Sequence, residues 1–233
     1  MKQSFDEYAQ EYDAWFLNNR NVLYSEVNLV ASTLKDAGRV LSVGCGSGLF
    51  EMIMAKEYGI TVTEGIEPSE GMAAIARKRG MNVTIATAEE ADFGSGDYDT
   101  ILFNGTPSYI TDLEGVIRKA YAALPSGGRI ILVDVPKESS YGLMYNLAKA
   151  LGTWEHPLLE GVYPPDPYPI EFVKMANWRT TAEKTALLEK AGFVDLKYAQ
   201  TLTAHPLCSD LREEQPSEGH DKGDYVAITA FKA

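Results

Sequence analysis

The sequence is poor in cysteine and has no long apolar run. Its 233 residues include two cysteines, Cys45 and Cys208, which are far apart. Cys45 falls in a glycine-rich stretch where a disulfide would obstruct a ligand, so we expect a reducing compartment. No apolar run approaches the roughly 20 residues that a membrane helix needs. The first residues, MKQSFDEYAQEYDAW, lack the apolar segment of a signal peptide, so we expect a cytoplasmic protein with no membrane partner.

Positive charge and histidine are also scarce. The chain has 21 Lys and Arg against 33 Asp and Glu, which gives a net charge of −12. Such a surface repels phosphate backbones, which disfavours a nucleic-acid partner, although the charge also serves solubility. The three histidines include His205 and His220, which share a polar stretch with Cys208. Their spacing is loose and no fourth ligand is obvious, so no metal site is predicted.

Apolar runs rich in β-forming residues alternate with helical patterns along most of the chain. Strands separated by helices imply right-handed crossovers and a parallel, doubly wound α/β sheet. The predicted strands are Val40–Val43, Thr61–Ile66, Val83–Ala86, Thr100–Phe103, Ile130–Val135, Val194–Thr203 and Tyr225–Phe231. The predicted helices are Leu49–Tyr58, Gly71–Arg79, Leu113–Leu124, Tyr141–Leu151 and Thr181–Ala191, the last of which ends at Gly192.

Two segments depart from this alternation. Residues 1–35 predict one or two helices with an aromatic stripe that includes Phe5, Tyr8 and Tyr12. Residues 137–178 become rich in proline and aromatic residues. We expect one domain over residues 1–233, with 1–35 as a helical cover and 137–178 as an inserted cap or lid.

The stretch RVLSVGCGSGLFEMIMAKEYGITVTEGIEPSEGM, residues 39–72, carries the strongest chemical signal. Glycines at a strand-to-helix turn let backbone approach a ligand closely. Glu67 follows Gly46 by 21 positions and ends the next predicted strand, where an acid accepts hydrogen bonds from a ribose. An ordinary capping acid before a helix is the alternative for Glu67. The turn reads G-x-G-x-G, so both the dinucleotide fingerprint and the P-loop are absent.

Six motifs in order resemble the class I S-adenosylmethionine-dependent methyltransferases, in their small-molecule branch. After VLSVGCGSG and GIEPSEGMAAIAR come ATAEEADF, YDTILFNG, AALPSGGRIILVD and TTAEKTALLEKAGFVDLKY, and SFDEYAQEYDAWF resembles the N-terminal helix of that branch. The similarity covers residues 1–135 and 179–232. It implies a Rossmann-like sheet of seven strands with the last one antiparallel.

The resemblance also implies the cofactor and its contacts. S-adenosylmethionine would lie against the glycine turn, with its ribose on Glu67 and its adenine near Ala88. Two positions, Ser42 and Thr87, lack an acid that is frequent in the family. The implied cofactor-binding residues are Tyr12, Gly44, Cys45, Gly46, Ser47, Gly48, Glu67, Pro68, Met72, Ala88, Glu89, Asn104 and Gly105.

The expected reaction is methyl transfer to a small-molecule acceptor by in-line displacement, with catalysis mainly by positioning. No residue is identified as a catalytic base, and the sequence leaves the acceptor atom and the oligomeric state open. The substrate-binding candidates are Tyr109, Trp154, Tyr163 and Trp178. A cofactor-binding regulatory or accessory protein without turnover and an aminopropyltransferase on the same fold are the alternatives. A nicotinamide oxidoreductase is disfavoured because the third glycine of its fingerprint is missing.

Overall fold

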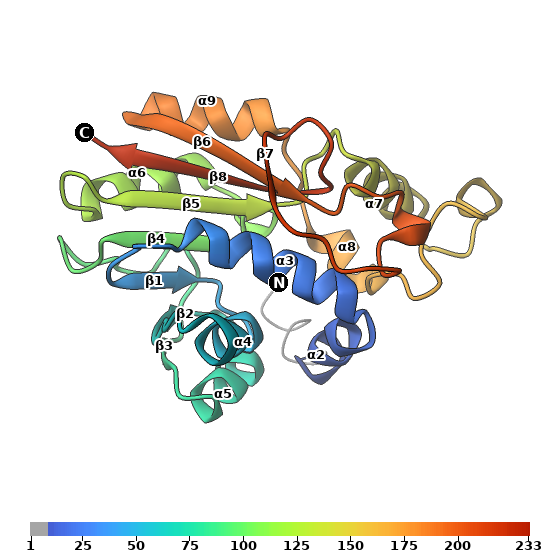
Figure 1. The fold of residues 1–233 in the computed structure, drawn as a ribbon, viewed down its shortest axis with the longest axis horizontal. Coiled ribbons are helices and arrows are strands. Elements are labelled where there is room, and N and C mark those ends of the chain that lie inside the picture. The colour runs from blue at the N-terminus through green and yellow to red at the C-terminus, as the bar shows by residue number, and fades with distance from the viewer. Residues whose placement is uncertain (1–8) are drawn as a thin grey trace.

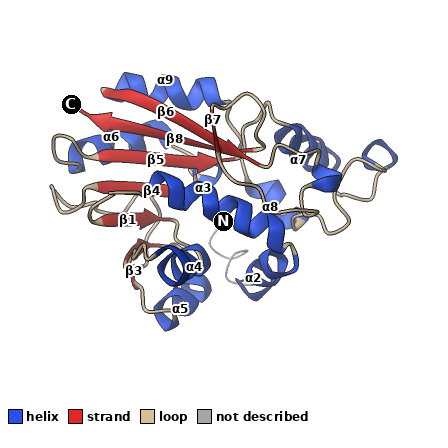
Figure 2. Cartoon of the chain, viewed as in Figure 1, coloured by secondary structure: helices blue, strands red, loops and turns tan. Residues whose placement is uncertain are grey.

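A computed structural model describes residues 9–233, so Phe5 and Tyr8 lie outside the described part of the chain. One sheet with the strand order β3-β2-β1-β4-β5-β8-β6-β7 runs through the molecule, with helices on both of its faces (Figure 2). The strands are β1 Val40–Val43, β2 Glu64–Ile66, β3 Asn82–Thr84, β4 Thr100–Asn104, β5 Arg129–Asp134, β6 Phe193–Thr201, β7 Ser217–Glu218 and β8 Tyr225–Lys232.

The pairing confirms the predicted topology. Strands β1 to β5 pair in parallel, and β8 pairs antiparallel with β5 on one side and β6 on the other. The two-residue strand β7 was not predicted and adds an eighth strand at the edge of the sheet, antiparallel to β6. The parallel strands end toward α2, α7 and α8 (Figure 1).

Two apolar layers hold the helices to the sheet. The helices are α2 Ala9–Asn18, α3 Arg20–Thr33, α4 Leu49–Tyr58, α5 Glu70–Lys78, α6 Leu113–Ala123, α7 Ser140–Leu151, α8 Ile170–Met175 and α9 Thr181–Ala191. Alternate residues of β5 face opposite layers: Ile131 and Val133 pack with α3 and α4, whereas Ile130 and Leu132 pack with α6 and α9. This alternation is the period of a strand buried on both faces.

The inserted segment 137–178 has an apolar cluster of its own. Helix α7, the short 3-10 helix Pro157–Leu159 and helix α8 pack together around Tyr145 and Trp154. The indole N–H of Trp154 donates to the carbonyl of Tyr168 at 2.8 Å. Helix α8 was not predicted, and it begins directly after Pro169, the last proline of the segment. The prolines before it form no helix longer than one 3-10 turn, as expected.

The polar segment between β6 and β8 folds back over α3. The Asp210 carboxylate accepts hydrogen bonds from the backbone N–H groups of Asn21 and Val22, at 2.8 and 3.1 Å, and so caps the start of α3. The Ser25 hydroxyl accepts from the N–H of Glu214 at 2.7 Å. Helix α3 is therefore buried on the sheet side and also beneath this segment.

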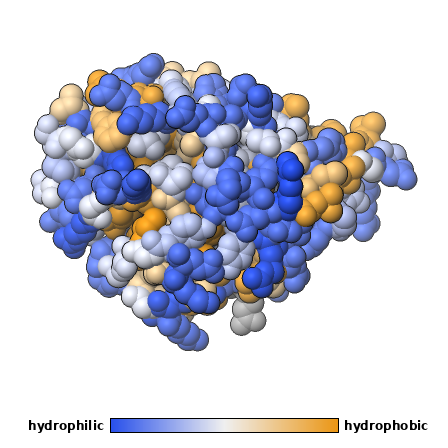
Figure 3. Space-filling model, viewed as in Figure 1, coloured by the Kyte–Doolittle hydropathy of each residue, from blue (hydrophilic) through white to orange (hydrophobic). Residues whose placement is uncertain are grey.

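The outer surface is mostly polar, but apolar side chains gather at the end of the molecule where α7 lies (Figure 3). Exposed leucines in this part of the fold include Leu143, Leu158 and Leu211. No described helix combines the length and the apolar character that crossing a bilayer requires.

Candidate functional site

A cavity of about 200 Å3 lies at the carboxyl ends of the parallel strands, between the sheet, α2, α3 and the inserted segment. In open α/β sheets this is where ligands bind. Of the predicted cofactor residues, those that line it are Tyr12, Gly44, Gly46, Glu67, Pro68, Met72, Ala88, Glu89, Asn104 and Gly105. Cys45 and Ser47 line a small adjoining pocket. Gly48 lies behind the turn, where an added Cβ would stand 2.7 Å from the sulfur of Met81.

The glycine turn after β1 needs its glycines for two reasons. Gly44 and Gly46 have φ values of +72° and +56°, a region that side chains disfavour. A Cβ on Gly44 would stand 2.5 Å from the side chain of Thr106. A Cβ on Gly46 would meet no protein atom within 4 Å, because Gly46 faces the cavity. Gly46 thus keeps open a space that a larger residue would fill.

Glu67 at the end of β2 is held in place by the backbone. Its carboxylate accepts hydrogen bonds from the N–H groups of Gly46 and Ser69, each at 2.9 Å, and its residue is 6% exposed. The N-cap of α5 is Ser69, whose hydroxyl accepts from the N–H of Met72 at 3.1 Å. Ser69 is therefore the N-cap residue of this helix, and Glu67 forms part of the cavity wall.

Lys119 of α6 fixes the loop that carries Ala88 and Glu89. Its ammonium group donates to the carbonyl oxygens of Ala88, Glu89 and Ala91 at 2.6, 2.9 and 2.6 Å. The Glu89 carboxylate also accepts from the N–H of Thr111 at 3.0 Å. The backbone of this loop is thereby presented to the cavity in one conformation.

An acid from α4 stands beside Ser42, where the family frequently has an acid in the strand itself. The Ser42 hydroxyl donates to the Glu51 carboxylate at 2.7 Å, and both residues are buried. Burial raises the pKa of Glu51, while the hydrogen bond from Ser42 lowers it. Glu51 lines the small pocket next to Gly44 and Asn104, so an acid is supplied there from the first turn of α4.

Helix α2 is attached to the glycine turn through Asp13. The Asp13 carboxylate accepts from the Ser47 hydroxyl at 2.5 Å and forms an ion pair with Arg79 at 2.6 Å. Arg79 also donates to the Ser47 carbonyl at 2.8 Å. These contacts hold Tyr12, Trp15 and Phe16 of α2 over the cavity, which all three line.

The far half of the cavity is aromatic. Of the substrate-binding candidates, Tyr109 and Trp178 line it, whereas Trp154 and Tyr163 do not. The rings of Trp154 and Tyr163 pack on each other, with centroids 5.6 Å apart, and Trp154 contacts the wall through its hydrogen bond to Tyr168. The other aromatic residues that line the cavity, none of them predicted as substrate-binding, are Tyr12, Trp15, Phe16, Phe50, Tyr145, Tyr168 and Tyr225. Tyr12 and Phe50 also line the small pocket beside the glycine turn.

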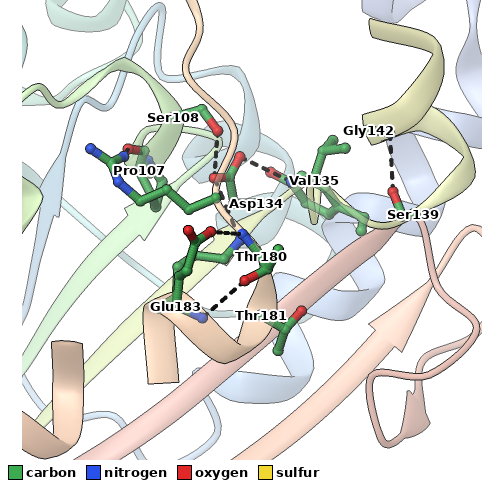
Figure 4. Close-up of polar contacts among 12 residues, drawn as sticks. Pro107, Ser108, Asp134, Val135, Ser139, Gly142, Thr180, Thr181 and Glu183 are labelled. Atoms are coloured by element: carbon green, nitrogen blue, oxygen red, sulfur yellow. Dashed lines mark hydrogen bonds and ion pairs between the residues drawn. The ribbon is translucent and has the colours of Figure 1, made fainter. Parts of the chain in front are cut away.

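Asp134, at the end of β5, lines the same half and is fully partnered (Figure 4). Its carboxylate accepts from the Ser108 hydroxyl at 2.6 Å and from the N–H of Val135 at 2.9 Å. The buried ammonium of Lys184 lies 3.6 Å away. Burial raises the pKa of Asp134, and Lys184 is the first of the groups that lower it.

Glu26 of α3 is the second acid of the aromatic half, and it has no such partners. It is 8% exposed and lines the cavity, yet its carboxylate makes no hydrogen bond or ion pair with the described residues. Burial raises its pKa to about 8. After burial itself, the Glu26 carboxylate is the largest cause of the raised pKa values of Tyr12 and Tyr225.

No group of three or more His, Cys, Asp or Glu side chains within residues 9–233 is arranged to hold a metal ion. His205 accepts a hydrogen bond from the N–H of Leu207 at 3.2 Å, and His220 packs on the ring of Tyr198, with centroids 4.7 Å apart.

Comparison with known proteins agrees with this geometry. A model of the methyltransferase domain family matches residues 15–198, which is more than half of the chain. The chain belongs to this family. Its fold and motifs make it a class I S-adenosylmethionine-dependent methyltransferase, as the resemblance implied.

Three relatives illustrate how far the similarity extends. The methyltransferase is 33% identical to a Thermotoga maritima protein of known structure, with a TM-score of 0.83 and 100% coverage of both chains. That protein is described as an S-adenosylmethionine-dependent methyltransferase and possible histamine N-methyltransferase. An uncharacterised protein of Methanocaldococcus jannaschii is 31% identical over 98% of each chain. The trans-aconitate 2-methyltransferase of Variovorax paradoxus is 29% identical over 54% of this chain and 49% of its own.

Glu26 and Asp134 were not predicted as site residues of the methyltransferase. Asp134 ends a predicted strand, and a position at a strand's carboxyl end is a usable signal. Glu26 also leaves a signal, because it is an acid on a helical stripe that is otherwise apolar, between Val22 and Leu29. An acid in such a stripe is buried unless the helix turns it outward.

Proposed function

We propose that this methyltransferase transfers a methyl group from S-adenosylmethionine to a small-molecule acceptor held in the same cavity. The observation that carries the proposal is the division of that one cavity. One part of its lining comes from the glycine turn and Glu67, and another comes from aromatic side chains of α2 and of the inserted segment, α7 included. A cofactor in the first half would face an acceptor in the second.

The residues of the first half fit the cofactor. Gly46 leaves open space beside the turn, and Glu67 offers a buried, fixed carboxylate as acceptor for the two ribose hydroxyls. Pro68, Met72 and Ala88 would contact the adenine, with the N–H of Ala88 donating to a ring nitrogen. These assignments follow the family motifs and the cavity lining together.

Two further groups would bind the methionyl end. The carbonyl of Asn104, which already accepts from the Thr106 hydroxyl at 3.0 Å, has a second lone pair for the methionyl amine. Glu51 lies close enough to Gly44 and Asn104 to share their small pocket. We assign to Glu51 the charge that an acid at position 42 supplies in other members of the family.

The cofactor supplies an already activated methyl group, so the chain needs mainly to position the acceptor and to exclude water. Such positioning contributes up to roughly 7–11 kcal/mol in ideal cases. The acceptor atom forms its bond to the methyl carbon as the sulfur–carbon bond breaks, and S-adenosylhomocysteine leaves. No residue is assigned as a catalytic base.

The two covers would enclose the reaction. The indole N–H of Trp15 on α2 donates to the carbonyl of Asp166 at 3.1 Å, and Asn19 donates to the Asp166 carboxylate at 2.9 Å. These bonds join the N-terminal helices to the inserted segment across the cavity. Both segments would have to separate to admit a ligand, which is the behaviour of a lid.

Turnover tests the proposal. The protein would be incubated with S-adenosylmethionine and a panel of amines, phenols, carboxylates and thiols that includes histamine, and S-adenosylhomocysteine would be measured. We expect acceptor-dependent release of S-adenosylhomocysteine, with Glu67→Ala as the cofactor-site control. Tight cofactor binding without turnover on any acceptor would favour the regulatory alternative. Transfer from decarboxylated S-adenosylmethionine instead would favour an aminopropyltransferase.

A further inference from the structure

The acids that line the cavity differ in how they are neutralised. Glu67 accepts from two backbone N–H groups and Glu89 from one. Asp134 has a hydroxyl, an N–H and the Lys184 ammonium. Glu26 has none of these among the described residues, although it is buried, as Glu67 and Asp134 are. A buried carboxylate without a partner is costly, because it loses its hydration and gains nothing in exchange.

The groups around Glu26 offer no compensating positive charge. The tyrosines whose pKa it raises are Tyr12 on α2, Tyr141 and Tyr145 on α7, and Tyr225 on β8. Tyr225 donates its hydroxyl to Asn104 at 2.8 Å, and Tyr141 shares a 2.6 Å hydrogen bond with Ser209. A hydroxyl that is already engaged in this way is not available to donate to Glu26. Glu26 therefore faces the cavity without a hydrogen-bond partner among the described residues.

The aromatic rings around this acid favour one class of ligand. A cation gains from the faces of tryptophan and tyrosine rings, and the gain grows when the site excludes water. A bound cation would stabilise the ionised carboxylate, whereas a neutral ligand of the same shape or an anion would leave Glu26 protonated, as its raised pKa favours. Rings and an unpaired carboxylate in one desolvated space together select a positively charged group.

We propose that the acceptor of this methyltransferase carries a positively charged nitrogen, and that Glu26 binds that nitrogen. The inference rests on the proposed function and narrows its substrate class to ammonium or imidazolium compounds. Glu26 is a binding residue that determines specificity in this account. Asp134, which Lys184 already neutralises, lines the same half without needing a cation.

Calorimetry with matched probes tests the inference. The protein would first be saturated with S-adenosylhomocysteine, which establishes that the cofactor half is functional. It would then be titrated with choline against 3,3-dimethyl-1-butanol, and with 2-phenylethylamine against 2-phenylethanol. The members of each pair are close in shape and differ in charge. We expect the cation to bind at least tenfold more tightly than its neutral match in at least one pair, and Glu26→Gln to reduce this preference below threefold.

A charge control and three contrary outcomes complete the design. Glu11→Gln makes the same substitution at an exposed position on α2 and should keep the full preference. A wild-type protein that prefers the cation in neither pair overturns the inference, and so does a Glu26→Gln variant that keeps the preference. If Glu26→Gln lowers the affinity for S-adenosylmethionine more than tenfold but the affinity for S-adenosylhomocysteine less than threefold, Glu26 interacts with the sulfonium of the cofactor and not with the acceptor. Failure of S-adenosylhomocysteine to bind at all counts against the proposed function itself.

Discussion

The two halves of the cavity are built in different ways. The half that we assign to the cofactor consists of turns at the ends of neighbouring strands, and its polar groups are fixed by the fold, as Glu67 is by Gly46 and Ser69. The half that we assign to the acceptor is lined by side chains that are far apart in sequence, among them residues of α2, α3, α7 and β8. It includes Glu26, which has no hydrogen-bond partner among the described residues. The polar groups of the first half are held in place before a ligand binds, whereas the second half contains an acid that, within the described part of the chain, has no partner until a ligand binds.

This difference has an energetic meaning. A site that is complete before its ligand arrives adds to stability or leaves it unchanged, while an unsatisfied acid lowers it. The cofactor half should therefore respond to mutation mainly in affinity. Mutation of the unpaired acid in the acceptor half should also change stability, and it should raise the free energy of unfolding.

The largest effect is expected at Gly46. Gly46→Val should weaken S-adenosylmethionine binding by more than about 3 kcal/mol. The valine side chain would fill the open space, and it would strain a backbone that has a positive φ at this position. Gly59→Val is the matched control, since Gly59 has φ +67° and also meets no atom within 4 Å, but it caps α4 on the exposed surface. Titration calorimetry on both folded variants measures the effect. Equal losses of affinity would show that backbone strain alone is responsible.

The next effect concerns the stability of the ligand-free protein as the pH changes. The pKa of Glu26 is about 8 in the fold against 4.5 in the unfolded chain, so between these values the folded state holds a proton that the unfolded state releases. The free energy of unfolding should therefore fall as pH rises from 4.5 to 8, by on the order of 3–5 kcal/mol from this group.

Glu26→Gln should remove that dependence. The variant should gain stability over the wild type as pH rises from 5 to 9, as measured by urea unfolding at several pH values, while Glu11→Gln should show no such trend. The tyrosines around Glu26 all have raised pKa values and do not titrate in this range. A difference between Glu26→Gln and wild type that stays constant with pH would mean that Glu26 is not held in an unfavourable charged state.

A smaller effect, on kcat/KM, should distinguish residues that line the cavity from residues that support its wall. Trp178→Ala should change kcat/KM for the acceptor about tenfold, or roughly 1.4 kcal/mol, because Trp178 lines the cavity. Trp154→Phe keeps a ring behind the wall and loses only the bond to Tyr168, so it should change kcat/KM threefold or less. Steady-state kinetics with S-adenosylmethionine at saturation gives both numbers. A larger effect for Trp154→Phe would indicate that the acceptor binds closer to the core of the inserted segment.

The elements that could be predicted from the sequence carry their own local signals. β1, α4 and α9 have the predicted bounds, because glycines end both helices and a capping box of Thr180 with Glu183 starts α9. Helix α8 has only six residues and lies in a segment dominated by prolines, so its pattern was too short to read. The two-residue strand β7 exists only through its pairing with β6, which no local pattern reports.

The same contrast applies to the site. The glycine turn and Glu67 could be predicted because the chain brings them together through one strand, one helix and the next strand. Trp154 and Tyr163 were chosen for their residue type alone, and in an irregular segment no period shows which side faces the cavity. Glu26 depends on how α3 is rotated against α2 and β8, which is a tertiary property. Motifs therefore predicted residues that line the cavity near the glycine turn, whereas the position of Glu26 in its lining becomes visible only in the folded chain.

Cofactor affinity in two variants measured side by side tests the division of the cavity most directly. Glu67→Ala and Glu26→Gln each remove one carboxyl group from a buried position that lines the cavity. Calorimetry should show that Glu67→Ala weakens S-adenosylmethionine binding by about 1.5–3 kcal/mol, because the two ribose hydroxyls lose a charged acceptor. The affinity of Glu26→Gln should stay within threefold of the wild type. A folded Glu67→Ala with unchanged affinity, or equal losses in both variants, would contradict the assignment of one half to the cofactor and the other to the acceptor.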